Sequence, residues 1–218
     1  MWMIVVGISL AKPIAARLVE DIDHLVDNSP PKLKKRMRAA MVRRIDGMGL
    51  PNCAEASERI CRHLVEMPEI QSARTALLFA CDLTEPDLLP LVGKDKPWRA
   101  AFPRIVGNGI LKFFLVDDPS NQLVEGKYGL REPDSELCAC VEPEDIDLVM
   151  APGRAFDEAC GARLGRGGGF YDRLLGGLSP QVPVIGVCFR CQLVDQVPIA
   201  EHDIPVQKIV TEAGVITI

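Results

Sequence analysis

The chain has 218 residues, of which 48% are hydrophobic and 25% are charged, and its formal net charge is −5 at pH 7. This length suits one large domain, or one domain with an appendage, and the composition is ordinary for a folded soluble protein. The negative charge gives no global signal for nucleic-acid binding, and no apolar run approaches the length of a membrane span. We therefore expect neither a nucleic-acid partner nor a membrane partner.

The eight cysteines are scattered, and several fall within apolar stretches. Buried, reduced thiols of a cytosolic protein have this distribution. The pairs Cys138–Cys140 and Cys188–Cys191 lack a second ligand pair at zinc-site spacing, so a thiol-bound metal is not expected. The first ten residues are apolar but lack a basic flank, which is poor for a signal or transit peptide. We expect a cytoplasmic enzyme.

Residues 1–31 are predicted to be an N-terminal extension. Ile14, Leu18, Ile22 and Leu25 recur at helical spacing, and a Ser-Pro-Pro sequence ends this stretch. The sequence assigns no function to it.

An amphipathic helix is predicted next. Leu33, Met37, Met41, Ile45 and Met48 recur at spacings of four and three residues, which places them on one face. Gly-rich sequence then closes the helix.

The other faces of this helix are basic. Lys34 and Arg38 are four residues apart and therefore project together. A charge run of this kind is typical of a solvated surface, but the same two cations suit a polyphosphate. The residues alone leave both interpretations open.

The rest of the chain alternates predicted strands and helices. Asn52 and Glu55 resemble a capping pair at the start of a helix that packs through Ile60, Leu64 and Met67. Pro86 marks a short helix over residues 87–92, and a further helix is expected over 169–175. Strands are expected at residues 75–81, 98–102 (stopped by Pro103), 111–116, 146–151, 182–189 and 209–218.

This alternation predicts an α/β class fold, with a three-layer α/β/α arrangement around a mostly parallel sheet, in a single domain over residues 32–218. Ligands of such sheets bind at the carboxyl ends of strands. The loops after residues 81, 103, 151 and 189 are therefore the candidate positions for a site.

The most informative segment runs from Arg163 to Arg173 and reads Arg-Leu-Gly-Arg-Gly-Gly-Gly-Phe-Tyr-Asp-Arg. Its glycines leave backbone N–H groups unblocked just before a predicted helix, whose dipole favours anions. Arg163, Arg166 and Arg173 add positive charge, so the loop suits a nucleotide phosphate. Asp172, in the first helical turn, is placed to meet a magnesium ion carried by that nucleotide.

Two familiar phosphate loops do not fit this segment. The Walker pattern requires a Lys after its second glycine, and no Lys lies between Lys127 and Lys208. The dinucleotide pattern Gly-x-Gly-x-x-Gly fits Gly165 and Gly167, but Phe170 occupies the third glycine position. The segment is therefore a phosphate loop of another kind or only a flexible turn.

Several motifs together resemble a known family. They are, in chain order, Lys34-x-x-x-Arg38, Phe79 to Glu85, Pro103-Arg104, Gly129 to Pro133, Asp147 to Gly153, Ala155 to Asp157, Arg163 to Asp172, Gln196 to Pro198 and Glu201 to Asp203. In order and spacing they resemble the 5-formyltetrahydrofolate cyclo-ligase family, also called methenyltetrahydrofolate synthetase. The resemblance covers roughly residues 32–212, and its central motif is specific.

The resemblance implies an activity. ATP and magnesium would drive conversion of 5-formyltetrahydrofolate to 5,10-methenyltetrahydrofolate, with release of ADP and phosphate. The γ-phosphoryl group would pass to the formyl oxygen, and N10 would then attack the formyl carbon as phosphate leaves. Phosphoryl transfer depends on positioning and charge neutralisation, which a cationic, glycine-lined pocket with magnesium supplies. The partners would be reduced folate and ATP, with the chain a monomer or small homo-oligomer.

The resemblance also implies which residues hold the nucleotide. Arg166 would lie near the transferring group, and Arg166 and Tyr171 are the catalytic candidates. Asp172 and Asp203 would be magnesium ligands. The ATP-binding residues would be Lys34, Arg38, Arg163, Leu164, Gly165, Arg166, Gly167, Gly168, Gly169, Phe170 and Tyr171.

For the folate, the resemblance implies contacts with Ala80 and Glu85, the latter through the N–H donors of the pterin. Tyr171 would pack against the substrate, and Arg104 is a candidate for either anion. Two positions depart from the family pattern. Phe170 stands where many members have Tyr, and Gly168 replaces a Lys that is present in some members.

Two other functions remain open. A divergent, non-catalytic relative would bind a nucleotide, or RNA through the basic stretch 32–44, although aromatic content is only 5%. A sugar-phosphate isomerase or acyl-CoA transferase-like enzyme on a similar scaffold would need no ATP.

Overall fold

The computed structural model describes residues 29–107, 110–200 and 203–218. The predicted helical stripe within the N-terminal extension lies outside the described residues, as do Glu201 and His202 of the last matching motif. Among the described residues, no helix is both long and apolar enough to cross a membrane.

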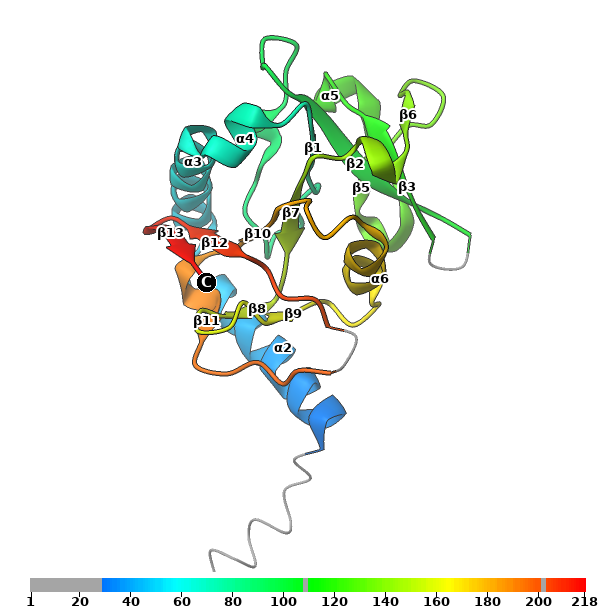
Figure 1. Cartoon of the computed structure of the whole chain (residues 1–218). Helices are drawn as coiled ribbons and strands as arrows, with labels where there is room; N and C mark the ends of the chain where they lie inside the picture. The colour runs from blue at the N-terminus through cyan, green and yellow to red at the C-terminus, as the bar shows by residue number, and fades with distance from the viewer. Residues whose placement is uncertain (1–28, 108–109, 201–202) are drawn as a thin grey trace, which may run out of the picture.

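A central sheet organises the molecule (Figure 1), with strand order β13-β12-β10-β7-β1-β2-β3-β6. The strands from β12 to β2 are parallel to one another, and β13, β3 and β6 pair antiparallel at the two sides. The predicted α/β class with a mostly parallel sheet is therefore confirmed. The strands are β1 (Thr75–Leu77), β2 (Arg99–Val106), β3 (Ile110–Leu115), β6 (Cys140–Val141), β7 (Leu148–Pro152), β10 (Val184–Val187), β12 (Lys208–Thr211) and β13 (Gly214–Thr217).

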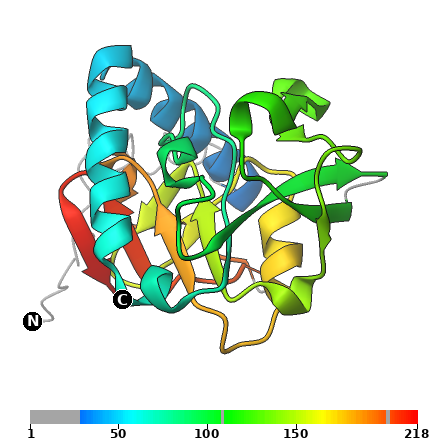
Figure 2. The same ribbon diagram turned by 90° about the horizontal axis from the view of Figure 1, so that it is seen from above.

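Helices cover both faces of this sheet (Figure 2). The helices are α2 (Pro30–Asp46), α3 (Leu50–Glu66), α4 (Pro68–Ser72), α5 (Pro119–Gln122) and α6 (Phe170–Gly177). α3 and α6 pack on opposite faces, so the three-layer arrangement expected from the sequence is present.

Alternation along the strands explains the two faces. Ala76 and Leu78 belong to the cluster that packs against α3, whereas Leu77 between them belongs to the cluster that contains α6. Met150 and Val149 of β7 divide in the same way. Successive side chains of a strand point to opposite faces, so an unbroken apolar run is buried on both sides.

Short elements complete the fold. A three-stranded sheet lies beside the main one, and a two-stranded sheet lies near β2. The strands are β11 (Leu193–Val194), β8 (Ala155–Asp157), β9 (Arg163–Leu164), β4 (Leu123–Glu125) and β5 (Arg131–Pro133). The 3₁₀ turns are η1 (Leu89–Leu91), η2 (Lys127–Gly129), η3 (Pro143–Asp145) and η4 (Arg190–Gln192).

The second strand does not end at Pro103, contrary to the prediction from the sequence. β2 continues to Val106, and Pro103 pairs with Phe113 of β3. The carbonyl of Ala101 faces β1, because it accepts a hydrogen bond from Leu78 N. The backbone groups of alternate residues in a strand face the same side, so the nitrogen of Pro103 also faces the β1 side, but beyond the last residue of β1. The N–H that proline lacks therefore costs the sheet no hydrogen bond.

The predicted capping pair is also corrected. α3 begins before Asn52, with Pro51 in its first turn, a position that proline suits because its missing N–H has no helical partner there. The Asn52 side chain instead donates to Met48 O at 2.7 Å, and Glu55 lies inside the helix.

Three other boundaries differ from the sequence predictions. α2 begins at Pro30, inside the range predicted as an extension, and the predicted helix 87–92 is only the 3₁₀ turn η1. The expected last strand is two antiparallel strands, β12 and β13, joined by a turn.

Of the cysteines, Cys140 and Cys160 are exposed rather than buried.

Candidate functional site

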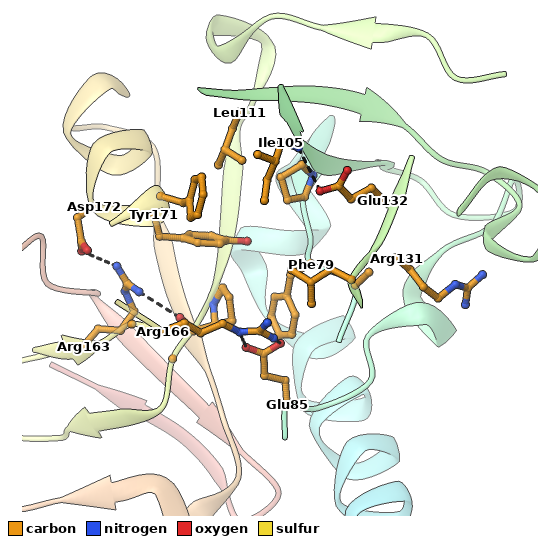
Figure 3. Close-up of a pocket in the computed structure, with 17 residues that line it drawn as sticks. Phe79, Glu85, Ile105, Leu111, Arg131, Glu132, Arg163, Arg166, Tyr171 and Asp172 are labelled. Atoms are coloured by element: carbon orange, nitrogen blue, oxygen red, sulfur yellow. Dashed lines mark hydrogen bonds and ion pairs between the residues drawn. The ribbon is translucent and has the colours of Figure 1, made fainter. Parts of the chain in front are cut away.

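A pocket lies where the segments after β1 and β7 meet β2 and the start of α6 (Figure 3). The space that it encloses is about 780 Å³, which includes open solvent at its mouth. The loops predicted after residues 81 and 151 both contribute to it, whereas η4 does not line it. The lining residues are Phe79, Ala80, Glu85, Pro103, Ile105, Leu111, Leu130, Arg131, Glu132, Pro152, Gly153, Arg163, Gly165, Arg166, Phe170, Tyr171 and Asp172.

The glycine loop runs from β9 to the N-terminus of α6, as the sequence predicted. Gly169 is the N-cap residue with φ +66°, and Gly167 has φ +108°, conformations that favour glycine. The basic helix α2 approaches this loop from far away in sequence. Arg38 Nε donates to Gly165 O at 2.8 Å across 127 residues. Arg38 is therefore at the loop rather than on a remote solvated face.

Arg166 forms a bidentate pair with Glu85 inside the pocket (Figure 3). The distances are 3.0 Å from Nε to Oε1 and 2.5 Å from Nη2 to Oε2, and Nη2 also lies 2.8 Å from Asp82 Oδ2. Burial raises the pKa of Glu85, while the Arg166 charge acts to lower it. Burial also acts to raise the pKa of Asp82, but a hydrogen bond from Thr84 and the Arg166 charge hold that pKa below its ordinary value.

Arg163 is held behind the loop by three contacts. Nη2 donates to Asp172 Oδ1 at 2.5 Å, Nη1 donates to Pro152 O at 3.2 Å, and the guanidinium lies 5.6 Å from the Tyr171 ring centroid. Its side chain is only 2% exposed, so this cation positions the first turn of α6.

Tyr171 presents an unusual buried hydroxyl. Its oxygen has no hydrogen-bond partner among the described residues, and Figure 3 shows it pointing into the pocket. Burial raises the pKa of Tyr171, so the neutral phenol is the form present at neutral pH. A buried hydroxyl without a partner is costly, and a ligand would provide one.

Lys34 and Asp203 lie together at the start of α2. Lys34 Nζ is 2.8 Å from Asp203 Oδ2, across 169 residues, and that oxygen also accepts from Ala200 N at 2.8 Å. Both side chains are largely buried, with 17% and 12% exposed. The two ends of the chain therefore contribute one ion pair of the predicted site.

The cations and acids predicted for the site are thus largely paired with one another. Arg166 pairs with Glu85, Arg163 with Asp172, and Lys34 with Asp203. Asp172 and Asp203 offer hard carboxylate oxygens of the kind that magnesium prefers. Within the described ranges, no group of three or more metal-ligating side chains occurs. Arg163 engages Asp172 and Lys34 engages Asp203, so an ion bound by either aspartate would take most of its ligands from phosphate oxygens and water.

Arg104, predicted to contact an anion, is not placed with the other site residues. It donates to Pro133 O, and it does not line the pocket. Its neighbours Pro103 and Ile105 line the pocket instead, because alternate residues of β2 share a face.

Gly168 and Phe170, the two departures from the family pattern, are sterically linked. A Cβ atom at Gly168 would lie 2.7 Å from the Phe170 ring, so a larger residue at 168 requires the ring to move. The Arg173 guanidinium lies 5.3 Å from the Phe170 ring centroid and donates to Gly168 O at 3.1 Å.

Three residues with clear structural roles were missed from the sequence. Arg154 donates to Thr84 and lies 3.2 Å from Asp82. Arg154 and Asp82 therefore reinforce the loop that carries Glu85. Gln192 is fully buried and donates to Gly153 O at 2.8 Å, which supports the pocket wall from η4. Asp82 and Arg154 each follow a predicted strand, and that position was the available signal. Nothing local marked Gln192.

An α/β fold with its pocket at the carboxyl ends of parallel strands is the arrangement of many small-molecule enzymes. The model of the 5-formyltetrahydrofolate cyclo-ligase family matches residues 31–212. The chain belongs to this family, whose named members are ligases.

Individual relatives agree with this assignment. The 5-formyltetrahydrofolate cyclo-ligase of Escherichia coli K12 is 31% identical over 170 residues, which cover 74% of this chain and 90% of that protein. The probable 5-formyltetrahydrofolate cyclo-ligase of Schizosaccharomyces pombe is 25% identical over 173 residues, covering 72% and 84%. The solved structure of Aquifex aeolicus 5,10-methenyltetrahydrofolate synthetase has 31% identity and a TM-score of 0.74, covering 85% of this chain and 92% of that chain.

Proposed function

We propose that this protein converts 5-formyltetrahydrofolate to 5,10-methenyltetrahydrofolate, using ATP and magnesium and releasing ADP and phosphate. Family membership supports the reaction class. The observation that carries the proposal is the meeting, in one pocket, of the arginine-bearing glycine loop with Glu85 and an apolar wall. A phosphoryl donor and a flat organic acceptor would lie side by side there.

The glycine loop would hold the triphosphate. Its backbone N–H groups precede the α6 N-terminus, and Arg38 reaches the loop from α2. Arg166 would turn from Glu85 to the transferring phosphoryl group, where a guanidinium neutralises developing charge. Lys34 would contact the phosphates after leaving Asp203. Asp172 and Asp203 would hold magnesium, which neutralises phosphate charge when bound.

The chemistry then follows from the positions of two substrates. The formyl oxygen would attack the γ-phosphorus, the bond to the β-phosphate oxygen would break, and ADP would leave. N10 would then attack the activated formyl carbon and lose its proton, and the carbon–oxygen bond would break with release of phosphate. The protein would position both partners and exclude water, which is the main need of phosphoryl transfer.

The apolar part of the pocket would hold the folate ring system. Phe79, Ile105 and Leu111 offer apolar walls, and Tyr171 lies across from them with its hydroxyl directed inward (Figure 3). Ala80 and Glu85 would contact the folate. Arg38 contacts the loop itself, which supports nucleotide binding over an RNA surface on α2.

Absorbance of the methenyl product tests this proposal. Purified protein with 5-formyltetrahydrofolate should form the product only when both ATP and magnesium are present, with stoichiometric ADP. Product without ATP would contradict the phosphoryl-transfer route. ATP turnover with other acids or sugar phosphates, but none with the folate, would contradict the substrate.

A further inference from the structure

A second buried carboxylate lines the pocket, on the side away from the glycine loop. Glu132, in β5, is only 4% exposed and is a lining residue. Its sole hydrogen bond within the described part of the chain comes from Ile105 N at 3.3 Å, and no Lys or Arg there pairs with it. A carboxylate oxygen pair has room for about four hydrogen bonds, so most of this capacity is unused.

The neighbouring cation does not neutralise Glu132. Arg131 donates to Pro119 O at 2.6 Å and to Leu123 O, and Figure 3 shows its guanidinium turned away from Glu132. Glu85 differs in this respect, because Arg166 engages both of its oxygens. The unused acceptor capacity of Glu132 would be filled by a ligand with N–H donors.

The surroundings of Glu132 hold it in place. A Cβ atom at Gly126 would lie 2.4 Å from the carboxyl carbon of Glu132, so glycine there makes room for the acid. Arg104 donates to the carbonyl of the next residue, Pro133, and thereby fixes β5 against β2. A side chain fixed in this way is preorganised for a ligand.

We propose that Glu132 recognises the aminopyrimidine edge of the pterin, accepting hydrogen bonds from its 2-amino group and the adjacent ring N–H. This inference rests on the function proposed above and names a specificity residue for it. Two neighbouring N–H donors match the two oxygens of a carboxylate, as a guanidinium does. Pro103 and Ile105, on the same wall, would flank the ring. Glu132 thus selects ring systems that carry the amino group.

Glu132→Gln is the first test. The amide oxygen can still accept from Ile105 N, so the fold is retained while the charge and one acceptor are lost. We expect the KM for 5-formyltetrahydrofolate to rise at least about tenfold, as for a lost charge-assisted hydrogen bond, with the KM for ATP within about twofold. Glu136→Gln, an exposed position outside the pocket, is the matched control and should match wild type. An unchanged folate KM, or equal rises for both substrates, would overturn the proposal.

A ligand lacking the 2-amino group tests the same contact without relying on the variant's folding. Calorimetry on wild-type protein should show that removal of this group weakens folate binding by about tenfold or more. The same change should matter less in Glu132→Gln. Equal affinity of wild type for both ligands would refute the role of Glu132. Failure of the function itself is distinguishable, because it would show as absent product formation with wild-type protein, whereas this binding comparison needs no turnover.

Discussion

At the scale of single residues, the site holds its charges in mutual ion pairs. Arg166 is the central case, because it neutralises Glu85, whose side chain is 2% exposed. Removal of a partner from a buried pair leaves an uncompensated charge, which costs more than the pair contributes. A substitution at Arg166 therefore affects stability as well as chemistry.

Arg166→Ala should lower kcat/KM by about a hundredfold or more, the usual loss for one charge-stabilising donor. Its stability should also acquire a pH dependence. With burial no longer opposed by Arg166, Glu85 binds a proton more tightly in the folded than in the unfolded chain. The wild-type Glu85 pKa is already raised by burial, and loss of Arg166 raises it further, so the stability deficit relative to wild type should grow as the pH rises from the folded-state pKa of Glu85 in wild type toward its folded-state pKa in the variant. Urea unfolding at several pH values measures this.

Two controls separate the effects. Adding Glu85→Gln to Arg166→Ala should remove the pH-dependent deficit but leave the rate low. Arg62→Ala, an exposed change on α3, should alter neither quantity. A deficit that shrinks with rising pH would contradict the assigned Arg166–Glu85 coupling.

At the scale of elements, the loop from β9 to α6 depends on glycine for its backbone. Gly167 has φ +108°, and a Cβ atom there would lie 3.5 Å from Arg38 Cζ, so the site has space but a strained conformation for alanine. Gly176, inside α6, would place its Cβ in open space at an ordinary backbone angle. A Cβ atom collides with nothing at either position, so the pair isolates the effect of backbone strain.

Gly167→Ala should raise the KM for ATP about tenfold, because roughly 1–2 kcal/mol of left-handed strain opposes the loop conformation. Gly176→Ala should leave this KM unchanged and stabilise the fold by up to about 1 kcal/mol through its helix propensity. Steady-state kinetics and thermal unfolding measure both. An unchanged KM in Gly167→Ala would show that the loop does not need this conformation.

A second contact between elements ties α4 to the sheet. Lys208 Nζ of β12 lies 2.5 Å from Glu69 Oε1, and this hydrogen bond lowers the pKa of Glu69. A carboxyl group whose pKa is lowered by folding stabilises the fold at pH values above its unfolded-state pKa, here 4.5. This stabilisation is lost as the pH falls through the folded-state pKa of the group.

Glu69→Gln should therefore lower the unfolding free energy at pH 7 by about 0.5–1 kcal/mol, as for a partly exposed pair. The difference in unfolding free energy from wild type should vanish as the pH falls below the folded-state pKa of Glu69. Glu66→Gln, at an exposed position in α3, should show no such difference. Denaturant unfolding at pH 7 and pH 3 checks the result, and an equal deficit at both would contradict the ion pair.

At the scale of the whole molecule, the site joins segments from both ends of the chain. Lys34 and Arg38 come from α2, while Asp203 precedes β12. Met41 of α2 is buried against Ala155 and Leu164 of the small sheet, so this helix is part of the core. The extension predicted over residues 1–31 lies outside the described residues up to position 28, and its last two residues, Pro30 and Pro31, belong to α2.

Deletion of residues 1–28 should leave turnover within about twofold of the full chain, since the site contacts described above begin in α2. Deletion through residue 46 should abolish turnover, because it removes both cations and a buried face of α2. Product absorbance and circular dichroism on the two shortened chains check this. Loss of activity on removal of residues 1–28 would show that they take part in the site.

The amino-acid sequence by itself determined the class of fold and the family, and it predicted a phosphate-binding role for the glycine–arginine loop. Apolar strand runs, helical periodicity and the glycine–arginine segment are local patterns, and the order of motifs indicated the family. Only the tertiary structure decided which residues meet. Arg38 with Gly165, Lys34 with Asp203 and Gln192 with Gly153 are pairs far apart in sequence, and no local pattern encodes their contact. It also showed Arg104 facing away and Glu132 buried in the pocket, because the face that a strand residue presents depends on which strands it pairs with.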